Sequence, residues 1–150
     1  MRIQTPFEEK LNTISHAIGA FFGIAALVLL IVFETKKTDN SLISVILYGI
    51  SIIVLFTEST LYHAAKTESK KYYFRIIDHI SIYLLIAGTY TPVLLITLEQ
   101  SLGWTLFYVV WGIALFGVIL KVFFTGRFEV FSTLLYLAMG WLIAVSYTHL

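Results

Sequence analysis

Five long apolar stretches separated by short polar breaks constrain this chain more than any other feature of its sequence. A membrane-spanning helix needs about 20 predominantly apolar residues to cross the hydrocarbon core of a bilayer. The five stretches occupy residues 14–33, 42–62, 74–97, 104–124 and 130–145. All five should be helices, because backbone groups in lipid must find their hydrogen-bond partners within the same segment. We therefore predict an all-α, polytopic transmembrane helix bundle, in which short connectors make neighbouring helices antiparallel.

The composition leaves no room for a soluble domain beside these helices. Hydrophobic residues make up 59% of the chain and charged residues 13%, whereas soluble domains carry about 25% charged residues. We therefore predict a single membrane domain over residues 1–150, with membrane lipid as its partner and no nucleic acid. The chain has no cysteine, which excludes disulfides and thiolate metal sites. A cleavable signal peptide is not expected, because the first apolar run is long and follows Glu8 and Glu9.

The distribution of basic residues predicts the orientation of the bundle. Eight of the ten Lys and Arg residues flank the helix ends on the side that holds the N-terminus. These eight are Arg2, Lys10, Lys66, Lys70, Lys71, Arg75, Lys121 and Arg127. Only Lys36 and Lys37 fall on the other side. Because cytoplasmic loops carry an excess of Lys and Arg, we predict a multi-pass protein with a cytoplasmic N-terminus.

Polar and ionisable residues within the apolar stretches gather at one depth. His16 lies near the start of the first predicted helix, Ser59 and His63 at the end of the second, and Asp78 at the start of the third. Antiparallel threading brings all four to the cytoplasmic side. Ser59 and His63 are four residues apart and share one helix face. Ionisable residues within spans usually face the bundle interior and mark functional sites.

Two interpretations of this cluster follow from the residue types. A neutral imidazole beside a carboxylate and a hydroxyl suits Zn²⁺, with the histidine as ligand and the aspartate holding a metal-bound water. A zinc site needs three or four ligands, however, and these residues alone do not supply them. The alternative is a polar network between helices that only fixes their packing, with about 0.6 kcal/mol from each hydrogen bond.

The other polar residues at this end are interpreted as residues that stabilise the helices or their packing. Glu8 and Glu9 could be site residues, but acids are also favoured by the helix dipole at the start of a helix, and we prefer this second interpretation. His16 continues into Gly19 and Gly23 on one face, a pattern of small residues that lets another helix approach closely. His16 could support a site ligand or belong to this packing stripe, and we favour the packing stripe. His79 points about 100° away from Asp78 around the helix and is expected to make a hydrogen bond rather than bind a metal.

Three stretches of the chain stand out together: "EEKLNTISHAIGA" (residues 8–20), "STLYHA" (residues 59–64) and "RIIDHISIYLLIAGTYTP" (residues 75–92). With these stretches the chain resembles the bacterial hemolysin III family, the prokaryotic relatives of the progestin and adipoQ receptors. The stretches occur in the family's order and at about its spacing, and the third is the most specific. The resemblance implies a protein of the bacterial cell (inner) membrane. It also implies a bundle of seven transmembrane helices, of which five are expected here.

The resemblance further implies a zinc site and a possible hydrolase. In that family the zinc ligands are the histidine of an S-x-x-x-H motif on the second helix and the two histidines of an H-x-x-x-H motif on the seventh. An early aspartate of the third helix contacts a zinc-bound water. By this resemblance Ser59 is the motif serine, His63 is a Zn²⁺ ligand, and Asp78 is the water-orienting carboxylate. Ser59 and Asp78 are then the expected catalytic residues.

The chain also departs from the family pattern. It ends at Leu150 after five expected spans, without the sixth and seventh helices and their two histidines. We therefore expect a C-terminally truncated chain that binds no zinc tightly by itself. The final "SYTHL", residues 146–150, does not continue the expected pattern, and Glu58 stands where a small hydroxyl residue is usual.

These observations lead to one main hypothesis and two alternatives. The main hypothesis is a zinc-dependent membrane hydrolase of lipid amides or esters, in the full-length form. The first alternative is a pore-forming, cytolytic hemolysin, which the family name suggests. The second is a receptor-like membrane protein in which zinc is structural.

Overall fold

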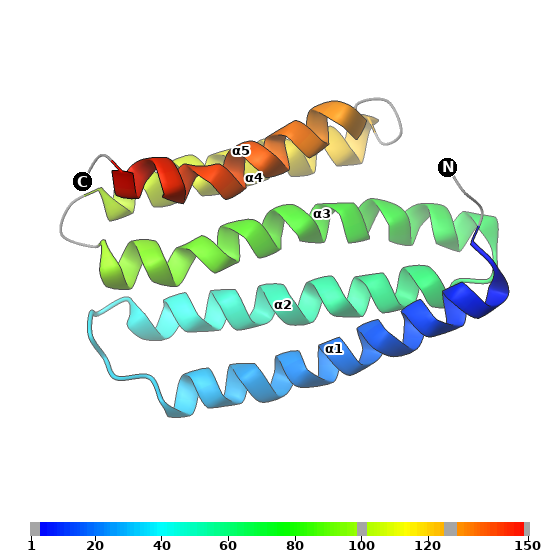
Figure 1. The fold of residues 1–150 in the computed structure, drawn as a ribbon, viewed down its shortest axis with the longest axis horizontal. Helices are drawn as coiled ribbons and strands as arrows, with labels where there is room; N and C mark the ends of the chain where they lie inside the picture. Colours follow the sequence, from blue (N-terminus) through cyan, green and yellow to red (C-terminus); the bar gives the residue numbers. More distant parts are fainter. Residues whose placement is uncertain (1–3, 99–101, 125–128, 149–150) are drawn as a thin grey trace.

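The computed structural model describes residues 4–98, 102–124 and 129–148, and in these ranges the chain is a set of long helices joined by short turns. Figure 1 shows the helices running back and forth along one common direction. Their bounds are α1 Pro6–Val32, α2 Ser41–Ala64, α3 Glu68–Pro92, α4 Gly103–Phe124 and α5 Glu129–Thr148, with a π-helical segment η1 at Val93–Thr97 directly after α3. The prediction of an all-α helix bundle is confirmed.

Helices α1 to α4 are long and apolar enough to cross a membrane. In the fifth helix the described apolar stretch is shorter and runs over Val130–Leu142. Each helix overlaps one stretch predicted from the sequence. The helices also extend beyond those stretches at the N-terminal ends of α1 and α3, where polar residues stabilise the first turn. At α1, Thr5 and Glu8 form a capping box, and at α3 the hydroxyl of Thr67 accepts from the amide of Lys70.

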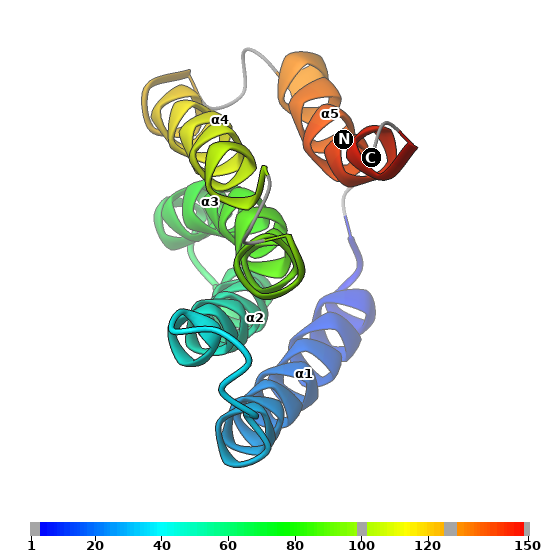
Figure 2. The same ribbon diagram turned by 90° about the vertical axis from the view of Figure 1, so that its left-hand side faces the viewer.

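The helices pack mainly on their neighbours in sequence. Helix α2 lies between α1 and α3, α4 packs on α3, and α5 lies against both α3 and α4. The end-on view in Figure 2 shows α1 and α5 at the margins of this arrangement. Helix α3 is the most buried of the candidate spans, with 44% of its apolar window inside the protein, whereas α1 has 6%. The bundle is therefore centred on α3, and α1 is a peripheral helix that packs on α2.

Small residues allow α1, α2 and α3 to approach one another closely. A Cβ atom added at Gly19 would contact the ring of Phe56, and one at Gly23 would lie 3.0 Å from the side chain of Ile52. Between α2 and α3, a Cβ at Gly88 would lie 2.8 Å from the Cβ of Ser51. The glycine stripe predicted on the first helix is therefore confirmed as a packing surface for α2.

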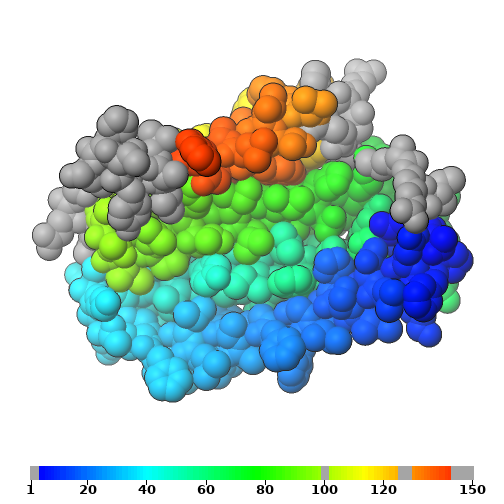
Figure 3. Space-filling view, viewed as in Figure 1, coloured from blue at the N-terminus to red at the C-terminus, as the bar shows by residue number. Residues whose placement is uncertain are grey.

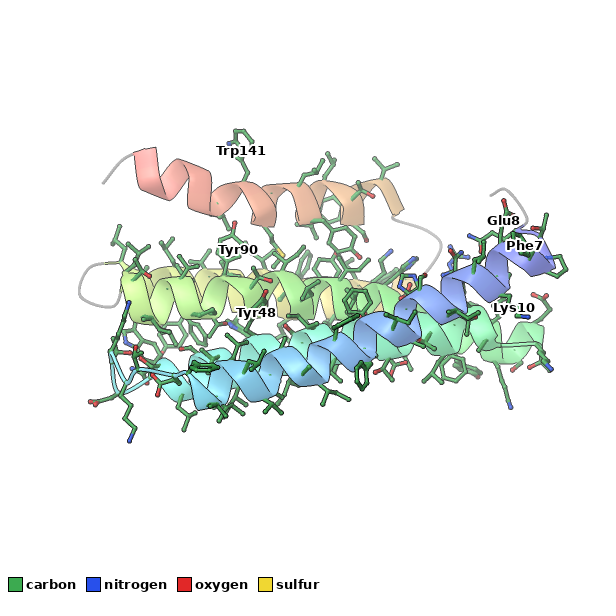
Figure 4. The ribbon with its side chains drawn as sticks, turned by 60° about the horizontal axis from the view of Figure 1, so that its bottom comes forward. Phe7, Glu8, Lys10, Tyr48, Tyr90 and Trp141 are labelled. Carbon is green, nitrogen blue, oxygen red and sulfur yellow. The ribbon has the colours of Figure 1, made fainter. Side chains whose placement is uncertain are left out.

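The buried hydrophobic core lies where α3 packs against α4 and α5. It contains the fully buried residues Tyr83 and Met139, with Ala87, Tyr90, Leu94, Val110 and Ala114 around them. The hydroxyl of Tyr90 donates to the carbonyl of Met139, and the indole of Trp111 donates to Thr91 Oγ1 over 3.1 Å. Figure 4 shows Tyr90 at this α3–α5 contact, while Trp141 points away from the other helices.

The outer surface is strongly apolar. On α1 the side chains of Phe21, Phe22 and Val32 are all more than 60% exposed. The space-filling view in Figure 3 shows α1 lying along one edge of the molecule for its whole length. Such a surface suits acyl chains rather than water, as expected for a membrane protein.

Candidate functional site

The predicted polar cluster lies at one end of the bundle, where α1 begins, α2 ends and α3 begins. We call this region the polar end and define it by residues 5–16, 58–64 and 67–79. Its geometry follows from the connection between α2 and α3, which consists only of residues 65–67. A link of three residues forces the two helices to run antiparallel and keeps His63 near the first turns of α3.

A carboxylate from α1 joins the two other helices at this end. Glu9 Oε2 lies 2.7 Å from His63 Nδ1, and Glu9 Oε1 accepts from the ammonium group of Lys71. The Glu9 side chain is 18% exposed and that of His63 10% exposed, so water competes weakly for these contacts. Lys71 also lies 5.5 Å above the ring of Tyr62, which packs edge-on against His63. Glu9 therefore connects α1, α2 and α3 through one side chain.

His16 stacks on His63. The two rings lie 5.5 Å apart between centroids and 15° from parallel, and the other side of His16 approaches the ring of Phe56. The histidine from α1 thus covers the imidazole from α2 and limits its movement. The sequence assigned His16 to packing with the glycine stripe, and its contact with Phe56 places it in that stripe.

Ser59 and Asp78 lie at the same end of the bundle but do not bond to His63 in the described part of the chain. Ser59 is 7% exposed, one helical turn before His63 on the same face. Asp78 is half-buried and interacts electrostatically with His16 and with Glu58. The structure brings the predicted residues to one end, and their predicted chemical roles stay predictions.

Two further charged residues, which the sequence interpretation did not assign to the site, lie at this end. Glu58 places a second acid near Asp78, and its Oε2 atom is buried without a hydrogen-bond partner among the described residues. Lys121, in the last turn of α4, is only 3% exposed. The backbone of His79 makes a further contact at this end, because its carbonyl accepts a hydrogen bond from the hydroxyl of Tyr136 over 3.1 Å.

The pairing of Glu9 with His63 was missed from the sequence, where both Glu8 and Glu9 were assigned to the helix dipole. The structure separates them. Glu8 accepts from the backbone amide of Thr5 over 2.7 Å and caps α1, and Figure 4 shows it at the start of that helix. Glu9 instead turns towards α2 and α3. The signal that could have found it is spacing, because Glu9 lies seven residues before His16 and therefore on the face that packs on α2.

The donor set of the polar end fits part of a metal site. Among the described residues, no group of three His, Asp or Glu side chains is arranged to hold a metal ion. The contact of His63 Nδ1 with the carboxylate of Glu9 is of the kind that metal-binding histidines commonly make through their second ring nitrogen. Further donors would be needed from outside the described residues.

The structure also contains a pocket that lies away from the polar end. It has a volume of about 510 Å³ and lies at the other end of the bundle, between the end of α1, the start of α2 and η1, lined mainly by apolar side chains such as Leu29, Phe33 and Val45. No residue of the polar end lines it. We place the candidate site at the polar end because its ionisable side chains converge there.

The fold and the site define a polytopic α-helical membrane protein whose ionisable side chains gather at one end of the bundle. The family model for haemolysin-III related proteins matches residues 4–150, and the chain belongs to this family. It is 48% identical over 140 residues to Hemolysin-3 of Bacillus cereus and 44% identical over 140 residues to a Hemolysin-3 homolog of Bacillus subtilis (strain 168). Each match covers 93% of this chain and 64% and 66% of the respective relative. No solved structure matches the chain.

Proposed function

We propose that the polar end is one part of a zinc-dependent hydrolytic site that acts on lipid amides or esters, in the complete protein. The observation that carries the proposal is the position of His63, held between the carboxylate of Glu9 and the ring of His16. An intramembrane histidine fixed in this way is prepared to bind a metal through its free nitrogen.

The residues of this chain would have distinct tasks at such a site. His63 would hold the metal, Asp78 would accept a hydrogen bond from a water molecule, and Ser59 could donate to the oxygen of a substrate carbonyl. Zinc, when bound, lowers the pKa of its water to about 7 and polarises a carbonyl group. Lipid substrates would reach the site from within the bilayer, along the apolar helix surfaces.

Lipid hydrolysis by the complete protein tests this proposal. We expect the protein, reconstituted in liposomes with lipid amide and ester substrates, to release fatty acid, and a chelator to abolish the release. His63→Ala should lose activity and bound zinc together, while His79→Ala, a matched change one helix away, should retain both. Hydrolysis that persists after zinc removal, or in His63→Ala, would refute a zinc-dependent site at this position.

A cytolytic function is the second candidate, because the relatives carry the name Hemolysin-3. It predicts that the protein releases dye from liposomes at equal rates as wild type and as Asp78→Ala. A receptor-like protein with structural zinc is the third. In that case zinc removal lowers the melting temperature while the reconstituted protein shows no turnover before or after.

A further inference from the structure

The two oxygens of the Glu9 carboxylate contact side chains of two different helices. Oε1 accepts from Lys71 on α3, and Oε2 lies 2.7 Å from His63 Nδ1 on α2. The three side chains are shielded, with exposed fractions of 18% for Glu9, 10% for His63 and 30% for Lys71. This arrangement is more specific than a helix-dipole interaction, which would need only a negative charge near the first turn of α1.

The identity of these atoms determines where the hydrogen lies on His63. An ionised carboxylate can only accept hydrogen bonds, so the hydrogen between Glu9 and His63 belongs to Nδ1. A neutral imidazole carries one hydrogen, and the other nitrogen, Nε2, then keeps a free electron pair. The contact with Glu9 therefore selects one of the two tautomers and holds the ring at one angle.

We propose that Glu9 is a positioning residue that fixes His63 in the tautomer able to bind a metal through Nε2, while Lys71 occupies the other oxygen of the Glu9 carboxylate. The proposal rests on the proposed function for its metal, but the tautomer is a property of this chain alone. A carboxylate on the second nitrogen of a metal-binding histidine is a common device, and its loss costs about 10- to 100-fold in metal affinity.

The isosteric change Glu9→Gln gives an unusually sharp test. Lys71 has three donors and no acceptor, so it requires the oxygen of the new amide. The NH₂ group of Gln then faces His63 and can bond only to an unprotonated Nδ1. The hydrogen must move to Nε2, which removes the electron pair that a metal would use. Adding Lys71→Met should reverse this, because the amide can then turn its oxygen back to His63.

The tautomer can be read from the ¹⁵N chemical shifts of the imidazole of His63 in the detergent-solubilised 150-residue chain at alkaline pH, where an unperturbed imidazole is neutral. The signal is assigned by His63→Asn. We expect Nδ1–H in the wild type, Nε2–H in Glu9→Gln, and Nδ1–H again in Glu9→Gln/Lys71→Met. Glu8→Gln is the matched control, because Glu8 caps α1, and it should keep the wild-type pattern.

Each result has a defined meaning. An Nε2–H or doubly protonated ring in the wild type, or an unchanged tautomer in Glu9→Gln, overturns the role of Glu9. If Glu9→Gln fails to fold, Lys71→Met alone must still show Nδ1–H, and Nε2–H in that variant overturns the proposal. Zinc affinity of the complete protein separates the two proposals. We expect a loss of about 10- to 100-fold in Glu9→Gln and recovery in the double variant. The tautomer shift in a protein that binds no zinc would refute the proposed function but keep the role of Glu9 in orienting His63.

Discussion

The contact between Gly88 on α3 and Ser51 on α2 gives the most direct test of how this bundle is packed. A methyl group added at Gly88 would lie 2.8 Å from Ser51 Cβ and closer still to Ser51 Oγ, but 3.4 Å from the carbonyl of Leu47. A distance below 3.0 Å requires something to move, whereas 3.4 Å is near an ordinary contact. Gly88→Ala should therefore destabilise the protein because of Ser51 and almost nothing else.

The expected magnitude follows from two opposing contributions. Inserting a methyl group into a packed interface costs about 1–3 kcal/mol. Replacing glycine by alanine in a helix returns up to about 1 kcal/mol. Gly88→Ala should thus lower the free energy of unfolding by about 1 kcal/mol. Ser51→Gly alone loses helix propensity and the hydrogen bond from Ser51 Oγ to the carbonyl of Tyr48, and should also cost about 1 kcal/mol.

The double variant Gly88→Ala/Ser51→Gly exchanges the small residue across the interface and removes the clash. It should be at least about 1 kcal/mol more stable than the sum of the single changes predicts, because contacting residues are not independent. Unfolding of the detergent-solubilised protein with sodium dodecyl sulfate, followed by far-UV circular dichroism, measures all four proteins. If the two effects simply add, or if Gly88→Ala is as stable as the wild type, the close α2–α3 contact is wrong.

Two further predictions use the same chain. Gly112 and Gly117 lie on one helix, but a Cβ at Gly112 meets nothing within 4 Å, whereas one at Gly117 would lie 2.6 Å from Tyr83 Cδ1 and closer still to other atoms of that ring. Gly112→Ala should change the unfolding free energy by less than about 0.5 kcal/mol or raise it, while Gly117→Ala should lower it by about 1–3 kcal/mol; equal effects would contradict the placement of α4. The orientation is tested by single cysteines, since the chain has none of its own. Ser69→Cys should react with a membrane-impermeant maleimide only in opened cells and Asp39→Cys in intact cells, and the reverse pattern would refute a cytoplasmic N-terminus.

The helices could be predicted from hydropathy, but their ends could not. The first and third apolar stretches were placed from residues 14 and 74, whereas α1 begins at Pro6 and α3 at Glu68. Hydropathy locates the part of a helix that crosses hydrocarbon, whereas polar caps such as Thr5 and Thr67 decide where the helix begins. The spans themselves stay predictions, since length and composition alone qualify a helix as a candidate.

The sequence predicted at which end of the bundle the candidate site residues lie, but not which of their side chains contact one another. Antiparallel threading correctly placed His16, Ser59, His63 and Asp78 at one end, because helix direction alternates whatever the details of packing. The pairing of Glu9 with His63 depends on how far α1 extends past the apolar region and on how it rotates against α2. Neither quantity follows from a span length, although the seven-residue spacing between Glu9 and His16 is compatible with the observed face.

The packing of α1 mainly on α2, in the described part of the chain, has a consequence for biogenesis. Docking of α1 through Gly19 and Gly23 uses surfaces that are complete once the chain has been synthesised as far as Ala64. The first two helices can thus associate in the bilayer as a hairpin while the ribosome is still translating the rest, as N-terminal units often do. Lys71 arrives next and reaches Glu9, so an ion pair closes a helical hairpin that has already formed.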